Sequence, residues 1–124
     1  MSRIDDLYET VGGSRTVNAA IDSFYRRVLE DESLRHFFDS TDMARLHAGQ
    51  SMFVSMLFGG RVVYTGKEIS AAHAQARTRG LTDEHFDMFL KHFRAALDEV
   101  GVEPDKAEKA MKLLEAQRGA VLNR

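Results

Sequence analysis

The sequence predicts an all-α domain, and three observations lead to that prediction. Apolar residues recur at intervals of three and four along several segments, which places them on one face of a helix. No segment shows the sustained alternation of apolar and polar residues that marks a half-buried strand. The 124 residues include one proline, so few turns are forced on the backbone. A chain of this length corresponds to a single domain, residues 1–124.

The first predicted helix runs from Ser14, a favourable N-cap, to about Glu30. Its apolar residues follow the 3.6-residue helical period, so we expect them to form one inner face. They are Val17, Ala20, Ile21, Phe24, Tyr25, Val28 and Leu29. A short segment follows from Ser33 to Phe38.

The pattern of residues in the middle of the chain predicts a longer helix, then a loop, then a short helix. Thr41 or Asp42 caps the longer helix, which extends to about Phe58. Its expected inner face contains Met43, Leu46, Gln50, Phe53, Val54 and Leu57. Residues 59–65 are expected to form a loop, and 67–76 the short helix.

Two further helices complete the predicted fold. Thr82 caps a long helix that ends at Gly101, with Phe86, Phe89, Leu90, Phe93, Leu97 and Val100 on its face. Pro104 suits the first turn of a last helix. Its expected inward residues are Ala107, Ala110, Met111, Leu114 and Val121.

Composition excludes several classes of function. The chain has no cysteine, which excludes disulfide scaffolds, thiolate metal sites and cysteine nucleophiles. It has 17 Lys and Arg against 19 Asp and Glu, so nucleic acid and anionic membranes are poor partners. Its apolar runs are too short to span a bilayer. The N-terminus has no signal-peptide core, so we expect a cytoplasmic protein.

Two polar residues lie on faces that are otherwise apolar. Tyr25 falls in the stripe of the first helix, and Gln50 falls in the stripe of the second. A buried amide without a partner costs a few kcal/mol, so something must meet it. One interpretation is a structural hydrogen bond between the two side chains, which the pattern alone favours. The other is that both line a cavity that binds something small.

The five histidines are the other candidates for chemistry. None lies in a His-Glu-x-x-His pattern, and no Gly-x-Ser-x-Gly nucleophile motif is present. His85 and His92 are seven residues apart on one helical face, but no third ligand lies near them in sequence. His73 has the small neighbours Ala72 and Ala76, which would leave room for a flat group beside the imidazole. Spacing alone favours an ordinary surface or half-buried histidine.

Several short segments, in a fixed order and spacing, carry a resemblance to a known family. They are Leu7-Tyr8 with Val11-Gly12-Gly13; Phe24-Tyr25-x-x-Val28-Leu29; Phe37-Phe38; Asp42-Met43-Ala44-Arg45-Leu46; Gln50-x-x-Phe53; Gly59-Gly60 with Tyr64-Thr65-Gly66; Ala72-His73; Gly80-Leu81-Thr82-x-x-His85-Phe86; and Val121-Leu122-Asn123. From Leu7 to Asn123 the chain resembles the group I truncated haemoglobins. The resemblance implies a truncated globin fold, a two-over-two helical sandwich around a haem.

The resemblance also implies roles for individual residues. His73 matches the proximal histidine, the one protein ligand of the haem iron. Tyr25 matches the distal tyrosine, whose hydroxyl donates a hydrogen bond to bound oxygen. Gln50 matches the distal glutamine that supports this hydroxyl or the ligand. Leu46 matches the distal position that is a histidine in ordinary myoglobin and is apolar here, as in mycobacterial members.

Other matched positions line or anchor the haem. Phe38 matches the phenylalanine that packs on the porphyrin, and further wall positions are expected at Phe53, Phe86 and Met111. Mycobacterial members carry a basic residue where Gly49 stands. The candidates to anchor the propionates instead are Arg45, Tyr64, Arg77 and Arg79.

Two departures concern how the haem is held. Gly49 stands where cyanobacterial relatives carry a histidine that binds the iron internally. His47 lies two residues earlier, and it either faces solvent or reaches the iron after a shift of its helix. Gln117 stands where those relatives bond haem covalently through a histidine, so we expect noncovalent haem b.

The resemblance implies binding of O2, NO and CO at a five-coordinate iron, and two functions follow. One is nitric oxide dioxygenation to nitrate, which needs an external reductase because the chain holds no flavin motif. The alternative is a non-enzymatic globin that stores, scavenges or senses oxygen. Peroxidase-like or electron-transfer activity is disfavoured, since the distal position lacks an acid–base histidine. A monomer or weak dimer is expected.

Overall fold

The structure is a computed structural model that describes residues 13–38, 42, 44, 47 and 66–123. These residues form helices, turns and loops without a strand, as the sequence predicts. The elements are α2 (Gly13–Glu30), the 3₁₀ turn η2 (Arg35–Phe38), α4 (Gly66–Ala72), α5 (Ala74–Thr78), α6 (Asp83–Glu99), α7 (Pro104–Glu115) and α8 (Arg118–Leu122). The helix predicted up to Phe58 lies, apart from residues 42, 44 and 47, outside the described residues.

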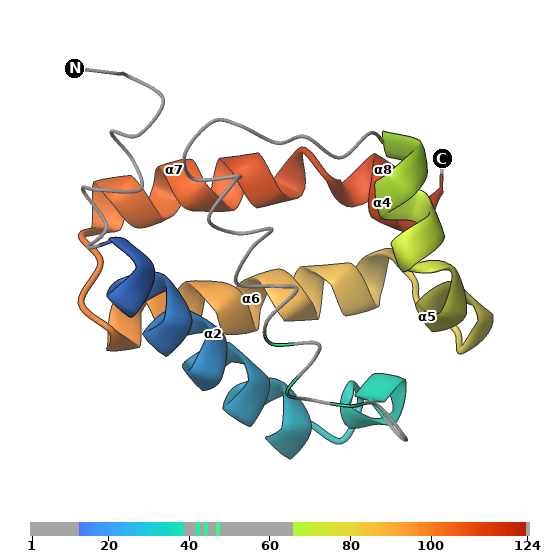
Figure 1. The fold of residues 1–124 in the computed structure, drawn as a ribbon, viewed down its shortest axis with the longest axis horizontal. Coiled ribbons are helices and arrows are strands. Elements are labelled where there is room, and N and C mark those ends of the chain that lie inside the picture. The colour runs from blue at the N-terminus through green and yellow to red at the C-terminus, as the bar shows by residue number, and fades with distance from the viewer. Residues whose placement is uncertain (1–12, 39–41, 43, 45–46, 48–65, 124) are drawn as a thin grey trace.

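The long helix α6 is the centre of the described fold. It runs antiparallel beside α7, and α2 crosses it on the other side (Figure 1). The largest core cluster joins the three helices through Ile21 and Tyr25 of α2, Phe93 and Leu97 of α6, and Ala107 of α7. These buried residues of α2 and α6 are among those that the apolar spacing placed on the inner faces.

Both ends of α6 follow the predicted local signals. Thr82, the N-cap residue, has an extended backbone, and its N–H donates to Nδ1 of His85 at 3.1 Å. The imidazole nitrogen therefore accepts a hydrogen bond from a backbone N–H at the start of the helix, where the N–H groups have no intrahelical acceptor. At the other end Gly101 has φ +87°, a left-handed conformation that suits glycine.

The prediction of one short helix over 67–76 was wrong, because the helix breaks at His73. The backbone of His73 has φ −106° and ψ 6°, and it separates α4 from α5. Its N–H donates to the Ser70 carbonyl at 3.2 Å, a tight i→i−3 bond instead of a continued α-helical one.

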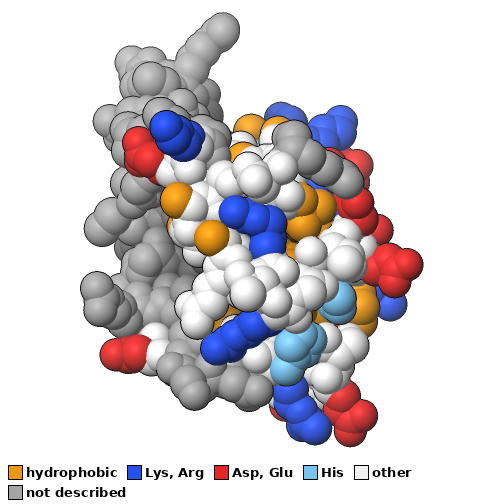
Figure 2. All heavy atoms as spheres, turned by 90° about the vertical axis from the view of Figure 1, so that its right-hand side faces the viewer, with side chains coloured by type: hydrophobic (Ala, Val, Ile, Leu, Met, Phe, Trp, Pro, Cys, Tyr) orange, Lys and Arg blue, Asp and Glu red, His pale blue; other side chains and the backbone are white. Residues whose placement is uncertain are grey.

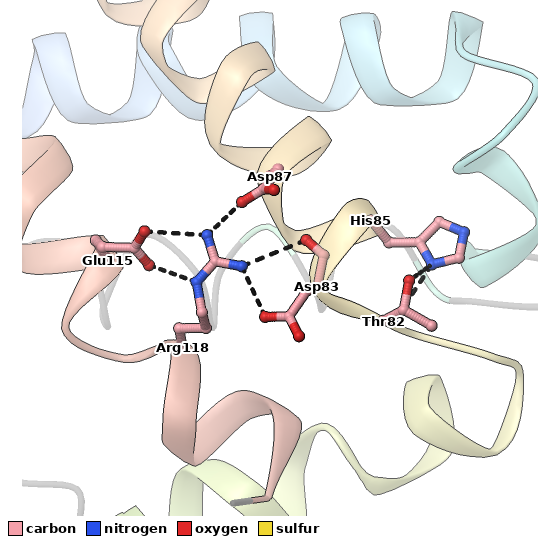
Figure 3. Close-up of polar contacts among 6 residues, drawn as sticks. All are labelled: Thr82, Asp83, His85, Asp87, Glu115 and Arg118. Atoms are coloured by element: carbon pink, nitrogen blue, oxygen red, sulfur yellow. Dashed lines mark hydrogen bonds and ion pairs between the residues drawn. The ribbon is translucent and has the colours of Figure 1, made fainter.

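The prediction of one continuous last helix was also wrong. The C-terminal helical segment divides after Glu115 into α7 and α8. Between them the N–H of Gln117 donates to the Leu114 carbonyl at 3.0 Å. The first residue of α8, Arg118, contacts carboxylates on both α6 and α7 (Figure 3). These contacts join α8 to α6 and to the end of α7.

One residue of the predicted inner face of α2 lies outside it. Leu29 is 39% exposed, whereas the preceding Val28 is fully buried against Leu34 and Phe37. Successive residues of an α-helix are about 100° apart, so Leu29 turns toward solvent once Val28 faces that cluster.

Side-chain hydrogen bonds join the C-terminal half of α2 to the C-terminal end of α6. Ser23 is a buried polar residue, 3% exposed, and its hydroxyl donates to the Glu99 carboxylate. Arg26 donates from Nη2 to both oxygens of that carboxylate, at 2.6 and 2.8 Å. The bonds from Ser23 and Arg26 lower the pKa of Glu99.

A second polar contact ties the segment after α2 to the middle of α6. Nε2 of His92 lies 2.7 Å from Oδ2 of Asp31, and both side chains are largely buried. Asp31 also accepts the backbone N–H of Ser33 at 2.9 Å. The hydrogen bonds from His92 and Ser33 lower the pKa of Asp31 to about 2.

We expect Asp31→Asn to lower the free energy of unfolding by about 1 kcal/mol at pH 7, because it removes the ionised partner of His92. The folded-state pKa lies below the ordinary value of 3.8, so the ionised carboxylate stabilises the fold above that pH. That contribution is lost as the pH falls toward 2, and the two proteins should converge there. Urea unfolding followed by circular dichroism measures the difference.

Asp98→Asn is the matched control, since Asp98 is 56% exposed and pairs only with Arg94 one turn away among the contacts described. It should change stability by less. A difference between wild type and Asp31→Asn that does not shrink in acid would contradict the role given to Asp31.

Candidate functional site

Among the candidate site residues that the structure describes, Tyr25 is the most buried. It is 6% exposed on α2, and its ring lies 5.2 Å from that of Phe24 and 5.8 Å from that of Phe38. Burial raises the pKa of its hydroxyl well above the usual value of 10. Tyr25 is therefore a neutral hydroxyl at neutral pH.

The surroundings of Tyr25 are aromatic and apolar. Phe24 also packs against Phe93 of α6 at 5.6 Å, and Phe38 against Phe89 of α6 at 6.1 Å. Edge-to-face packing of this kind fixes ring orientations as well as burying area. A hydroxyl in such surroundings meets little competing water, so its hydrogen bonds are stronger than in solvent.

His47 lies beside the same tyrosine. Its ring centroid is 6.4 Å from that of Tyr25, and its Nε2 is 2.6 Å from Oδ1 of Asp22 on α2. The side chain of His47 is 29% exposed. The Asp22 contact decides neither prediction for His47, so a solvent-facing side chain and one that reaches the iron after a shift of its helix both stay predictions.

His73 occupies the break between α4 and α5. The residue is half-buried, its N–H donates to Ser70 O, and its carbonyl accepts the N–H of Arg77 at 3.1 Å. The flanking Ala72 and Ala74 are exposed. The imidazole thus stands on a backbone that is hydrogen-bonded on both sides of the break.

Two contacts join this region to α8. The guanidinium Nη1 of Arg77 donates to the carbonyls of Ser70 and Val121, each at 2.8 Å. The hydroxyl of Ser70 donates to Oδ1 of Asn123 at 3.0 Å. The end of α4 that carries His73 is therefore held against the C-terminal helix.

The structure places the other predicted wall residues in different clusters. Met111 is partly buried against the cluster that contains Tyr25, and Phe38 packs on that cluster too. Phe86 belongs to a separate cluster with Val121, and the guanidinium carbon of Arg118 lies 4.6 Å from its ring centroid. The structure thus brings Tyr25 and Phe38 into contact, places Met111 on the same core cluster, and puts Phe86 nearer α8.

Five predicted site residues lie outside the described residues: Gln50, Leu46, Phe53, Arg45 and Tyr64. Of the two other candidate propionate anchors, Arg77 binds backbone carbonyls as given above. Arg79 donates from Nη1 to the carbonyls of His36 and Phe37, at 3.3 and 3.2 Å. Both arginines therefore hold the backbone together.

Arg118 is the residue that the sequence reasoning missed. It donates to Asp83 at 3.0 Å, to Glu115 at 2.6 Å and to Asp87 (Figure 3). The hydrogen bonds from Glu115, Asp87 and Asp83 raise its pKa. Its partners on α6 are 31 and 35 residues away, so no local pattern marks it.

Charge is unevenly distributed at the end of the molecule formed by α4, α5 and α8. Lys and Arg side chains run across the middle of this face, while most of its Asp and Glu side chains lie along one edge (Figure 2).

In the part of the chain that the structure describes, no helix is long and apolar enough to cross a bilayer.

Comparison with known proteins identifies the family. The family described as bacterial-like globin matches residues 6–123. A group 1 truncated hemoglobin from Synechocystis is 42% identical over 100 residues, covering 80% of this chain and 81% of that protein. One from Tetrahymena pyriformis is 36% identical over 124 residues and covers all of both chains.

Solved structures agree with this assignment. The 2/2 hemoglobin of a Synechococcus species, in the cyanomet state and with covalently attached heme, has a TM-score of 0.87 and 36% identity, covering 95% of this chain and 98% of that one. The ferric truncated hemoglobin of T. pyriformis has a TM-score of 0.82 and 37% identity, covering 94% and 97%. These similarities confirm the predicted truncated globin fold. The chain belongs to the bacterial-like globins, and within them to the group 1 truncated haemoglobins, which are haem proteins that bind small ligands.

Proposed function

We propose that this globin binds haem b noncovalently through His73, binds O2, and converts NO to nitrate with electrons from a separate reductase. The observation that carries the proposal is Tyr25, a hydroxyl that keeps its proton in aromatic, apolar surroundings. When bound, the haem would supply an iron that can take a gaseous ligand. It would also supply one electron, because one O2, one NO and one electron together give one nitrate ion. The reductase would then restore that electron to the haem.

The described residues fit such a group. A haem iron in a globin takes one imidazole from the protein, and His73 offers one on a backbone fixed by hydrogen bonds on both sides. Phe38 offers apolar surface next to Tyr25, and Met111 offers it on the same core cluster. A single nitrogen donor and apolar walls match the needs of a flat, largely apolar cofactor.

Tyr25 has the proposed distal role because it is a hydroxyl donor buried among aromatic rings. The hydroxyl donates a hydrogen bond to the ligand, and the apolar rings around it limit competition from water. Gln50 supports that hydroxyl or the ligand directly, and Leu46, which has no polar group, adds no donor. These two roles rest on the match to the family's distal positions.

The noncovalent attachment and the propionate contacts also follow from residue identities. A solved relative is described with covalently attached heme. Gln117, half-buried at the start of α8, replaces the histidine that forms such a bond in relatives, so this chain lacks the attacking imidazole. Because Arg77 and Arg79 bind backbone carbonyls, Arg45 and Tyr64 are the better candidates for the propionates.

His73→Gly is expected to remove the protein ligand of the iron. The variant should bind haem weakly, and added imidazole should restore a five-coordinate ferrous spectrum. Visible absorption of the ferrous protein with and without imidazole measures this. His36→Ala is the matched control, since His36 is also half-buried and should leave the spectrum unchanged. A normal ferrous spectrum in His73→Gly without imidazole would show that another residue binds the iron.

Tyr25→Phe removes the proposed donor and keeps the ring volume. We expect oxygen to dissociate roughly ten- to a hundredfold faster, the effect of losing one hydrogen bond in a dry site. Release of carbon monoxide, which is less polar when bound, should change far less. Gln50→Leu should have a smaller effect, and the double variant should be less than additive because both residues belong to one network. Stopped-flow measurement on the four proteins tests this, and equal effects on both gases would indicate altered access instead.

Nitrate formation tests the proposed enzymatic function itself. When the oxygenated protein is mixed with NO, we expect stoichiometric nitrate and ferric haem, at a rate near the diffusion limit, and repeated turnover once a cellular reductase is added. Nitrate that forms slowly, without turnover, would leave a non-enzymatic globin that stores or senses oxygen.

A further inference from the structure

Arg77 makes an unusual pair of contacts at the point where the chain turns at His73. Its Nη1 donates to the Ser70 carbonyl and to the Val121 carbonyl, each at 2.8 Å. The Ser70 carbonyl is also the acceptor of the His73 N–H at 3.2 Å. The Ser70 carbonyl therefore accepts two hydrogen bonds, one from the backbone N–H of His73 and one from the side chain of Arg77.

A donor is needed there because α4 ends one residue before His73. The last carbonyls of a helix have no intrahelical partner, and a cation near them also interacts favourably with the helix dipole. Arg77 lies on α5, beyond the break, and satisfies a carbonyl before it. It thus ties the two short helices on either side of His73 to each other.

The second acceptor of Arg77 ties this pair of helices to a fixed element. Val121 is 8% exposed on α8, and the hydroxyl of Ser70 makes a parallel link to Asn123. Arg118 in turn binds α8 to Asp83 at the start of α6. A continuous path of hydrogen bonds therefore runs from α6 through α8 to the carbonyl that accepts the His73 N–H.

We infer that Arg77 is a positioning residue: by fixing α4 and α5 against α8, it sets the direction of the His73 imidazole and hence its bond to the haem iron. The inference rests on the proposed role of His73 as the iron ligand. Without Arg77, the break at His73 keeps the bond from its N–H to the Ser70 carbonyl and loses both links from the guanidinium. The imidazole then samples a wider range of directions.

The test compares three variants of the haem-loaded protein. Arg77→Met keeps the length of the side chain and removes its donors, and Arg77→Lys keeps the charge but reaches fewer acceptors. Arg79→Met is the matched control, because Arg79 also donates from Nη1 to two carbonyls, but to those of η2. Resonance Raman of the ferrous, ligand-free protein reports the iron–histidine stretching band. We expect this band to shift and broaden in Arg77→Met, to change less in Arg77→Lys, and to stay in place in Arg79→Met.

A second comparison separates this inference from the proposed ligand role. In His73→Gly with added imidazole, the ligand is not attached to the backbone, so Arg77→Met should no longer affect the band. If His73→Gly alone left the original band unchanged, the proposed role of His73 would fail, whatever Arg77 does. If Arg77→Met shifted the band equally with free imidazole, the ligand role would stand and the positioning role would be wrong.

Hydrogen exchange supplies a readout that does not depend on ligand binding. In the loaded protein, Arg77→Met should accelerate exchange of the His73 amide roughly tenfold, with a smaller change in Arg77→Lys and none in Arg79→Met. Circular dichroism confirms that each variant is folded. An unshifted Raman band together with unchanged exchange in both Arg77 variants would overturn the inference, as would equal effects of Arg79→Met.

Discussion

The orientation of His73 depends on helices that are too short to be stable by themselves. α4 has 7 residues and α5 has 5, whereas isolated helices shorter than about 12 residues are marginal in water. Their direction must therefore come from tertiary contacts. The helix that makes these contacts with α4 and α5 is α8. It also has only 5 residues, and Arg118 binds it to α6. The candidate iron ligand thus takes its position from α6, a 17-residue helix with a buried face, through two arginines.

The distal candidate is held in a different way. Tyr25 lies on α2, an 18-residue helix that packs directly on α6, and its position follows from apolar and aromatic burial. Burial also keeps its proton in place, so no charged partner is required. One side of the proposed site is therefore fixed by packing, and the other by hydrogen bonds to backbone carbonyls. A core substitution near Tyr25 and a loss of Arg77 should disturb the two sides separately.

Local signals predicted the parts of the fold that depend on local physics. The faces of α2 and α6, the cap at Thr82 and the left-handed turn at Gly101 all follow from nearby residues. The divisions at His73 and after Glu115 were not predicted, and the arginine contacts beside them reach residues up to 44 positions away, which no local pattern marks. For the site, the stripe predicted that Tyr25 is buried, while only the resemblance gave His73 a role. Gln50, outside the described residues, remains a prediction.

The contacts of Arg77 also explain why the sequence gives little sign of them. Both of its acceptors are main-chain carbonyls, which every residue type provides, so neither bond from Arg77 depends on the side chain of Ser70 or Val121. Only the donor must be retained, and among side chains the guanidinium combines the reach and the several N–H groups needed to meet two carbonyls on different helices. Such a contact requires only an arginine four residues after the histidine, and it involves no acidic side chain that could be paired with that arginine in the sequence.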